Sequence, residues 1–236
     1  MRILAIDTAT ENCSAALLLN ERLLQREQLL DRGAAEAILP MVAELLREAG
    51  VRLSMLSAVA FGRGPGAFTG VRLAASVTQG LAFGAGLKVV PVSDLRALAQ
   101  RVLDDARAIE RVLVCTDARM QEVYWGCFER TAHGFARAVG EEYVTPPAGV
   151  RLPQPWELPS KAARERLAGV GSGFAAHSRL RAGLGLDLVL EGLFPRASEV
   201  ARLAVEEVVA GRIFPAEQAL PVYLRDDVTR APPGAS

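Results

Sequence analysis

The stretch ILAIDTATENCSAALLLNERLLQREQL, residues 3–29, decides the fold. It contains two apolar runs, Ile3–Ile6 and Ser14–Leu19, and a third run of mixed polarity, Arg22–Leu29. The pair Asn20-Glu21 separates the last two runs, and two residues are the length of a tight hairpin turn. The stretch therefore predicts three consecutive strands in hairpin order at the start of a sheet.

After this stretch, predicted strands alternate with predicted helices. Gly33–Ala49 and Gly70–Phe83 have the composition of helices, and short buried strands are predicted at Ala58–Phe61 and Val89–Val92. Strands in hairpin order followed by strand–helix alternation are typical of a mixed sheet with helices on its faces. The pattern begins again near Val112, so the sequence predicts two related α/β units.

These units set the expected lobe boundaries. We expect the first lobe to span residues 1–108 and the second lobe to span residues 109–215. Residues 216–228 are expected to return and pack on the first lobe. The end of the chain is rich in Pro, Gly and Ala, so residues 229–236 are expected to form a flexible tail.

The composition is that of a globular chain without a strong charge. Half of the 236 residues are hydrophobic, which is enough for a sizeable core. Lys and Arg together number 27, as do Asp and Glu together, so the formal net charge is zero. Proteins that bind nucleic acid on their own usually present a basic face. The charge balance therefore disfavours independent binding of nucleic acid.

The cysteines and histidines disfavour a disulfide framework and a zinc site. Cys13, Cys115 and Cys127 are widely spaced and form no Cys-x-x-Cys pair, so we expect three buried, reduced thiols. His133 and His177 are the only histidines, which makes a built-in zinc site unfavourable. The start of the chain does not resemble a signal peptide, and no charge-free stretch approaches the length of a membrane span. We therefore expect a cytoplasmic protein.

The most distinctive segment is the loop GPGAFTG, Gly64–Gly70, between a predicted strand and a predicted helix. Glycines permit close backbone approach, Thr69 is placed to cap the helix, and free N–H groups at a helix start attract anions. A phosphate cradle and a tight structural turn both satisfy this pattern. No Gly-Lys-Ser/Thr follows, so the loop is not a Walker loop. Spacing alone favours the turn.

A second candidate is the turn Asp7-Thr8-Ala9-Thr10 after the first strand. Its carboxylate could hold a hydrated metal bound to nucleotide phosphates, with the threonine hydroxyls assisting. The alternative is an Asx turn that closes the first hairpin, and Ala9 favours it because its Cβ restricts the approach of a phosphate oxygen. The candidate nucleotide contacts in both segments are Asp7, Thr8, Thr10, Gly64, Gly66 and Thr69.

A third candidate is Asp117-Ala118-Arg119, which is followed closely by Glu122. These residues could form a carboxylate site. A solvated turn with an internal ion pair is the commoner outcome, and such pairs contribute little to stability. We interpret the segment as a turn of that kind.

The two longest predicted helices have more apolar surface than one core uses. In Gly33–Ala49 the apolar arc is wider than the ~100° stripe of a helix that covers one core, and Gly70–Phe83 is nearly apolar all round. Pro40 is expected to bend the first helix because it lacks an N–H. Exposed apolar patches of this kind usually mark interfaces. The sequence thus predicts a protein–protein interface on these helices.

Four segments carry a resemblance to a known family: Ile3–Thr8, Gly64–Arg72, Asp117–Tyr124 and Pro221–Arg225. In this order they span nearly the whole chain and resemble the TsaB (YeaZ) family. One departure is Ala67, where the family loop often has serine. The resemblance implies an α/β fold of the actin/Hsp70-like (ASKHA) type, two-lobed, in which each lobe is a mixed β-sheet flanked by helices.

The resemblance also implies a non-catalytic subunit. Members of the family bind the catalytic subunit TsaD and, with the ATPase TsaE, support formation of threonylcarbamoyladenosine at position 37 of tRNA. TsaD-type enzymes carry a His-x-x-x-His metal site after the strand equivalent to Val89–Val92, whereas Ser93–Ala99 contains no histidine here. Without imidazole ligands the segment does not hold a metal as TsaD does. We therefore expect no catalytic residue and no metal site.

The family likeness further implies the partners. The two apolar helices are expected to pair with two equivalent helices of TsaD, and to form a homodimer when TsaD is absent. Contact with tRNA is expected only through the complex, with no membrane contact. We expect no cofactor, and weak binding of a nucleotide between the lobes stays open. The expected interface residues are Ala34, Ala37, Met41, Leu45, Gly70, Ala74, Val77 and Leu81.

The alternative function is an active small-molecule kinase or ATPase of the same superfamily. It would need an intact phosphate loop at Asp7–Thr10 and a metal carboxylate, and ATP turnover by the chain alone would support it. A metalloprotease is disfavoured because the chain has no His-x-x-x-His or His-Glu-x-x-His pattern. An interaction module unrelated to tRNA is distinguished only by its partner.

Overall fold

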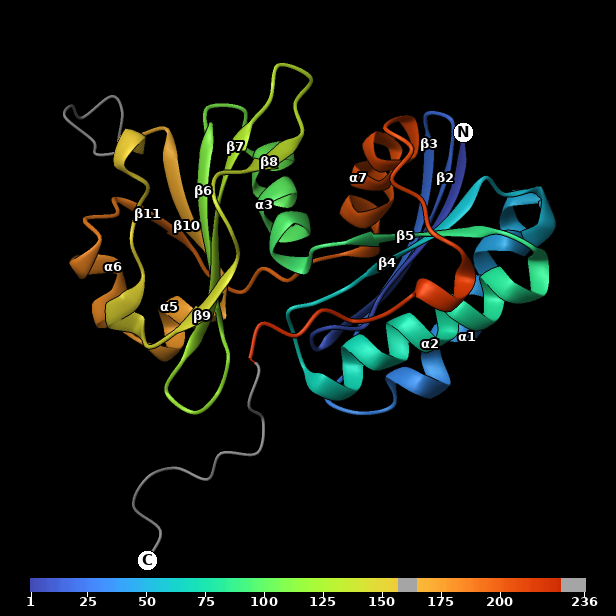
Figure 1. Cartoon of the computed structure of the whole chain (residues 1–236), viewed down its shortest axis with the longest axis horizontal. Helices are drawn as coiled ribbons and strands as arrows, with labels where there is room; N and C mark the ends of the chain where they lie inside the picture. The colour runs from blue at the N-terminus through green and yellow to red at the C-terminus, as the bar shows by residue number, and fades with distance from the viewer. Residues whose placement is uncertain (157–164, 226–236) are drawn as a thin grey trace, which may run out of the picture. The chain divides into compact units, whose positions relative to one another are not determined.

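Figure 1 shows the computed structural model of the chain, in which residues 1–156 and 165–225 are described. These residues form two units, each with its own β-sheet and its own hydrophobic core. The expected tail, 229–236, lies outside the described residues, so its flexibility stays a prediction. Across the described part of the chain, no helix combines the length and hydrophobicity needed to cross a bilayer.

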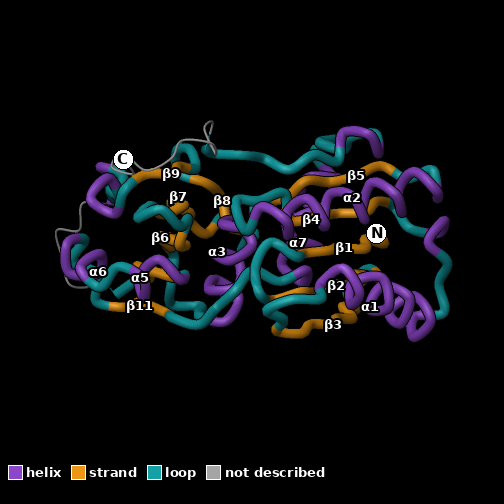
Figure 2. The backbone as a smooth tube through the Cα atoms, turned by 90° about the horizontal axis from the view of Figure 1, so that it is seen from below, coloured by secondary structure: helices purple, strands orange, loops and turns teal. Residues whose placement is uncertain are grey.

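The first sheet begins with the three predicted strands, β1 (Arg2–Asp7), β2 (Asn12–Leu19) and β3 (Arg22–Leu29). They pair antiparallel in chain order, so the predicted pair of hairpins is confirmed. β4 (Ala58–Gly62) and β5 (Lys88–Val92) extend the sheet in parallel from the other side of β1. Figure 2 shows the resulting order, β3-β2-β1-β4-β5.

Helices cover both faces of this sheet, which explains why β1 and β2 are continuous apolar runs that are buried on both sides. α1 (Ala34–Ala49) packs on β2 and β3, and α2 (Phe68–Ala85) packs on β4, β1 and β5. α7 (Ala197–Val209) packs on β1, β2 and β4 from the opposite face (Figure 1). Pro40 lies inside α1 without ending it, and α1 ends at Ala49, where Gly50 caps it in a left-handed conformation with a φ of 66°.

The second unit repeats the strand scheme of the first. β6 (Arg111–Asp117) pairs antiparallel with β7 (Val123–Arg130) and parallel with β10 (Leu167–Val170), which pairs in parallel with β11 (Leu188–Leu190). β1, β2, β4 and β5 are joined in the same way, so the prediction of two related α/β units is confirmed. The remaining elements of the unit are β8 (Ala136–Ala138) and β9 (Tyr143–Thr145), both paired with β7, and the short helices α5 (Ser172–Ala176) and α6 (Arg179–Gly183).

The chain is divided between the units differently from the expected limits 1–108 and 109–215. The first unit comprises Met1–Arg101 and Phe194–Val222, and the second contains Val102–Leu193. The expected second lobe is therefore wrong over the segment that holds α7. The reason is that the apolar side of α7 packs on the first sheet, a contact that its sequence periodicity alone does not reveal.

The chain after α7 stays on the first unit as far as Val222. Phe214 exchanges two backbone hydrogen bonds with Val89 of β5, at 2.8 and 2.9 Å. Val222 N–H donates to the Arg63 carbonyl at 2.8 Å, beyond a short 3₁₀ turn, η4 (Ala216–Gln218). The exposed edge of β5 is thereby partly covered by the returning chain.

All three cysteines are buried and unpaired, which confirms the predicted reduced thiols. Burial raises the pKa of Cys13 to about 11, with a further rise from the nearby negative charge of Asp7. Burial likewise raises the pKa of Cys127 to about 12, and raises that of Cys115 still further. The thiols therefore stay protonated at neutral pH and behave as small core side chains.

Arg130 at the end of β7 holds the carboxyl end of α3 (Asp94–Asp105) in place. Its guanidinium donates to the carbonyl groups of Leu103, Ala106 and Ile109, the last two at 3.0 to 3.2 Å. Carbonyl groups at a helix end have no partner within the helix, and Arg130 binds one of these, that of Leu103, together with two in the segment that follows α3. Arg130 thus connects the end of β7 to the segment that follows α3.

Replacing Arg130 with methionine should destabilise the protein by about 2–4 kcal/mol, because several carbonyl groups lose a charged donor while the apolar stem is kept. Urea denaturation measures the change. The matched control is Arg137→Met, which removes an exposed ion pair with Glu129 in the same sheet and should change stability by less than about 0.5 kcal/mol. Equal effects of the two substitutions would contradict the role given to Arg130.

Candidate functional site

The candidate site lies where the two predicted segments meet, at the carboxyl ends of β1 and β4. These strands are parallel neighbours, so the turn after β1 and the loop after β4 leave the same edge of the sheet. The Ala67 N–H donates to the Ala9 carbonyl at 2.8 Å, and Thr8 Oγ1 donates to the Gly70 carbonyl at 2.7 Å. The structure thus brings together two segments that are far apart in the sequence.

Glycine is required at positions 66 and 70 because the turn packs directly on their backbone. A Cβ at Gly66 would lie 2.5 Å from the Ala9 carbonyl oxygen, and one at Gly70 would overlap the Thr8 carbonyl oxygen. The Ala67 N–H and the Thr8 hydroxyl, which a phosphate cradle would need, are bonded within the protein. This packing supports the interpretation of the loop as a tight turn.

The two other threonines do not join these contacts. Thr10 Oγ1 accepts the Asn12 N–H at 3.2 Å, which helps to close the turn between β1 and β2. Thr69 is exposed and lies inside the first turn of α2, because the helix begins at Phe68 after the N-cap residue Ala67. The predicted capping role of Thr69 is therefore wrong, since a cap must precede the first helical residue.

Asp7 is at the centre of the site and is fully buried. Its Oδ1 accepts the Ala9 N–H at 2.8 Å, which forms the Asx turn proposed for this position. Burial raises the pKa of the Asp7 carboxyl from 3.8 to about 6. The hydrogen bond from the Ala9 N–H and the nearby Asp94 carboxyl oppose this rise in pKa, and the charge of Glu199 adds to it. The carboxyl therefore faces other acidic groups inside the protein.

Asp94 is the residue that sequence analysis missed. It begins α3, it is 2% exposed, and its Oδ2 accepts the Gly64 N–H. Its Oδ1 lies against Gly62, where an added Cβ would overlap that oxygen and lie 3.2 Å from Asp7 Cγ. The sequence feature that could have identified Asp94 is an acidic residue just after a buried strand, the same pattern as at Asp7. Sequence spacing does not show that these two strand ends lie on either side of β4.

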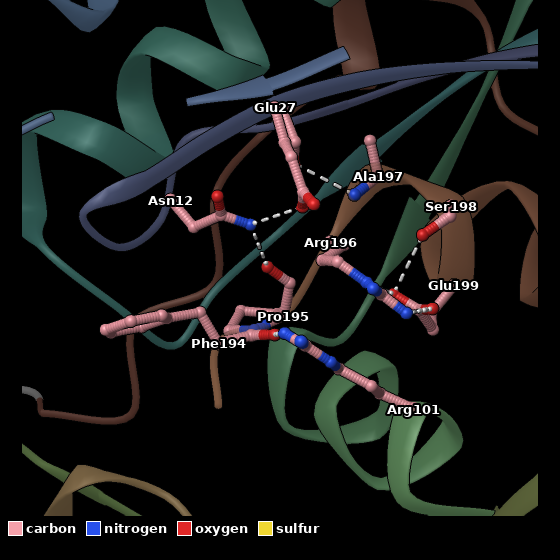
Figure 3. Close-up of polar contacts among 10 residues, drawn as sticks. Asn12, Glu27, Arg101, Phe194, Pro195, Arg196, Ala197, Ser198 and Glu199 are labelled. Carbon is pink, nitrogen blue, oxygen red and sulfur yellow. Dashed lines mark hydrogen bonds and ion pairs between the residues drawn. The ribbon is translucent and has the colours of Figure 1, made fainter. Parts of the chain in front are cut away.

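A polar network joins the start of α7 to β2 (Figure 3). Arg196 donates to the Glu199 carboxylate from Nε at 3.1 Å and from Nη2 at 2.7 Å, and Ser198 Oγ donates to it at 3.0 Å. Glu199 is 3% exposed, so its buried charge is balanced by Arg196. Two bonds to β2 complete the network: the Ala197 N–H to Ser14 Oγ at 3.0 Å, and Asn12 Nδ2 to the Pro195 carbonyl at 3.3 Å.

The polar atoms of this site bond to the backbone of the protein itself. Thr8, Asp7 and Asp94 each bond to a backbone group of another residue, and two of these bonds join separate segments. Among the residues that the structure describes, no three His, Cys, Asp or Glu side chains are grouped so as to hold a metal ion. The geometry supports a structural junction, and nucleotide binding at these residues stays a prediction.

The predicted interface residues on α1 and α2 fall into two classes. Leu45 and Ala74 are fully buried and Met41 is 9% exposed, all in the core of the first unit. These three side chains fill the core of the folded unit, so their surfaces are covered by it, and their place at an interface stays a prediction. The other five lie at the margin of the core and are partly exposed: Ala34, Ala37, Gly70, Val77 and Leu81.

Different residues of these helices carry the outward apolar surface. Phe83 is 79% exposed near the end of α2, and Leu39 on α1 is 49% exposed. A Cβ added at Gly80 would have nothing within 4 Å, so α2 is open to close approach at this point. A groove of about 340 Å³ lies here, lined by Ser76, Gln79, Gly80, Phe83 and Glu217.

The third predicted candidate, the turn between β6 and β7, contains an ion pair. Asp117 Oδ1 accepts the Arg119 N–H at 3.1 Å, and Arg119 Nη1 lies 3.4 Å from Asp117 Oδ2 with its side chain 84% exposed. The predicted solvated turn with an internal ion pair is confirmed. Arg225, which sequence analysis did not connect with this turn, donates to the Ala118 carbonyl at 3.2 Å and to the Glu122 carboxylate.

Comparisons with known proteins give one family-model match and several relatives that match along nearly the whole chain. A family model described as TsaD, tRNA N6-adenosine threonylcarbamoyltransferase, matches residues 28–217. The tRNA threonylcarbamoyladenosine biosynthesis protein TsaB of Escherichia coli is 40% identical over 97% of this chain and 96% of its own length. The TsaB protein of Haemophilus influenzae is 36% identical over 97% and 95%. The solved structure of YeaZ from Pseudomonas aeruginosa is 44% identical, with a TM-score of 0.84 over 94% of this chain and 99% of that one.

The junction makes a prediction about two glycines of α2. Gly70→Ala should destabilise the protein by about 3 kcal/mol or more, because its Cβ meets the Thr8 carbonyl and the backbone must move. Gly80→Ala is the matched control. Its Cβ meets nothing, so the change should stabilise the helix by about 0.5–1 kcal/mol. Urea denaturation at one fixed protein concentration measures both, and an unchanged stability of Gly70→Ala would contradict the packing described.

Proposed function

The chain belongs to the TsaB (YeaZ) family, and on that premise we propose that it is a non-catalytic subunit of tRNA threonylcarbamoyladenosine biosynthesis. In this proposal it binds the catalytic subunit TsaD and acts together with the ATPase TsaE on position 37 of tRNA. It contacts tRNA only through the complex, works in the cytoplasm and holds no cofactor. The observation that carries the proposal is the 40% identity to E. coli TsaB along nearly the whole of both chains.

A non-catalytic role is supported by what replaces the metal site of TsaD-type enzymes. The TsaD family model covers 28–217, so the chain is related to that enzyme family over most of its length. At the position of the expected His-x-x-x-His motif the chain has Ser93–Ala99, which begins α3. Leu95, Leu98 and Ala99 of this segment are buried in the core, so these three side chains serve packing.

The competing function, a small-molecule kinase or ATPase, is disfavoured by the same junction. A phosphate loop needs backbone N–H groups and hydroxyls that are free to bind phosphate oxygens. Here the Ala67 N–H and the Thr8 hydroxyl are engaged by the Ala9 and Gly70 carbonyl groups. The Asp7 carboxyl is buried rather than open to a hydrated metal.

The exposed faces of α1 and α2 are the proposed binding surface for TsaD, and for a second copy of this chain when TsaD is absent. Phe83 and Leu39 supply exposed apolar anchors, and Gly80 leaves room for a partner helix to approach closely. The groove beside Phe83 gives such a helix a place to insert a side chain.

Reconstitution of tRNA threonylcarbamoylation tests the function. Purified TsaD, TsaE, tRNA and the threonylcarbamoyl-adenylate donor are combined with and without this chain, and modified adenosine is measured. We expect product only when the chain is present, and no product and no ATP hydrolysis from the chain alone. Product formed equally well without the chain, or ATP turnover by the chain alone, would contradict the proposal.

The binding surface makes a separate prediction. Phe83→Glu and Leu39→Glu should each weaken binding to TsaD about tenfold or more, because a charge would be buried among apolar groups. Titration calorimetry measures the affinity. Val209→Glu is the matched control, since Val209 is 76% exposed on α7, on the opposite face of the sheet. An equal loss of affinity in all three variants would place the interface elsewhere.

A further inference from the structure

Two buried carboxyl groups face each other across Gly62. Asp7 is fully buried at the end of β1 and Asp94 is 2% exposed at the start of α3. Both lie against the Cα of Gly62, where a side chain of any size would overlap Asp94 Oδ1 and press on Asp7 Cγ. The space between β1 and α3 at this point is therefore filled by the two carboxyl groups themselves.

Backbone hydrogen bonds fix the orientation of both carboxyl groups. Asp7 Oδ1 accepts the Ala9 N–H at 2.8 Å, and Asp94 Oδ2 accepts the Gly64 N–H. Asp7 Oδ2 is buried and receives no N–H or O–H donor in the described structure, and the side chain within hydrogen-bonding reach of Asp7 is that of Asp94. Two ionised carboxylates offer only acceptors to each other, so a hydrogen bond between them requires a proton.

The surroundings of Asp7 do not supply a cation in place of that proton. From α7 the carboxylate of Glu199 faces it, and Arg196 is already bound to Glu199 by two hydrogen bonds. From β2 comes the thiol of Cys13, whose pKa is raised to about 11 by burial and by Asp7, and from β4 the side-chain-free Gly62. No three ligands are grouped for a metal ion in the described residues. Two negative charges at this depth would repel each other strongly.

We propose that Asp7 and Asp94 share one proton in the folded protein, and that this proton fastens the end of β1 to the start of α3 and to the Gly62–Gly64 backbone between them. The pair is a pH-dependent contact inside the first unit. Loss of the proton leaves two buried carboxylates that repel each other, so the contact is lost and the unit becomes less stable. The inference concerns this unit alone and does not depend on which partner the chain binds.

The direction of the pH effect follows from the affinity for the proton. Burial, as the largest effect, raises the pKa of Asp7 to about 6 from 3.8, so the folded chain holds the proton more tightly than the unfolded chain. The stabilisation is complete below about pH 4 and is lost as the pH rises through about 6. One bound proton changes the folding equilibrium constant about tenfold per pH unit across this window, or about 100-fold in all.

The test compares urea denaturation of the wild-type chain and Asp94→Asn between about pH 4.5 and pH 8, at one fixed protein concentration. Asparagine keeps an oxygen for the Gly64 N–H and gives Asp7 a permanent N–H donor that does not titrate. We expect the folding constant of Asp94→Asn, divided by that of the wild type, to rise by tenfold or more, up to about 100-fold, from the lowest to the highest pH. A ratio that does not change with pH would overturn the proposal.

Asp117→Asn is the matched control. Asp117 forms the same Asx turn after the first strand of the second unit, but its carboxylate is paired with the exposed Arg119 instead of a second carboxyl group. Its ratio to the wild type should stay level across the same pH range. A rise as large as that of Asp94→Asn would show that the effect does not come from the facing pair.

A second measurement covers the case in which Asp94→Asn does not fold. Carbon-13 NMR of the side-chain carboxyl groups of the folded wild-type chain follows the titration of each aspartate directly. We expect one proton to leave the Asp7–Asp94 pair with a midpoint near pH 6 or above, sensed at both residues. Two separate titrations near pH 4 would overturn the proposal.

Discussion

The turn after β1 lies directly on the first turn of α2, backbone against backbone, and the rest of the first unit is built around this contact. The carbonyl groups of Thr8 and Ala9 occupy the space where side chains at positions 70 and 66 would otherwise lie. The contact fixes how far the start of α2 stands from the end of β1, and α2 then covers β4 and β5. Because the interior is close-packed, a single added methyl group here has to displace either the helix or the strand. Packing against the turn is therefore sufficient to explain why this loop has glycine at positions 66 and 70.

The same aspartate turn occurs in both units, in two different electrostatic environments. In each unit the first strand ends in an aspartate that accepts the N–H two residues later, Asp7 from Ala9 and Asp117 from Arg119. The second turn is open to solvent, and its carboxylate is paired with a guanidinium. The first turn is buried, and its carboxylate meets another acid, Asp94. The same turn thus contains a solvated ion pair in one unit and a buried contact between two acidic side chains in the other, because long-range packing decides what each carboxylate faces.

The same packing engages polar groups at the end of β1 and leaves apolar groups exposed on α2. Groups that a phosphate-binding fold would offer to a nucleotide, such as the Thr8 hydroxyl, are bonded to the protein's own backbone. Apolar groups that a core would normally use, such as Phe83, are directed outward on α2 beside an open glycine. These two properties support the proposed role as a binding subunit. This balance agrees with membership of the TsaB family, whose E. coli member is named for tRNA threonylcarbamoyladenosine biosynthesis.

By itself the sequence determined the features that depend on neighbours along the chain: the three opening strands, the recurrence of the strand scheme near Val112, the Asx turn at Asp7 and the reduced thiols. Its motifs also indicated the family. Tertiary structure alone decided that α7 belongs to the first sheet, that Leu45 and Ala74 are core while Phe83 is outward, and that Asp94 meets Asp7. The reason is that hydrophobic periodicity and turn chemistry act over a few residues and leave a local trace. A helix that is apolar on most sides does not say which side a sheet will cover, and two carboxyl groups 87 positions apart have no local signal that they will share a buried space.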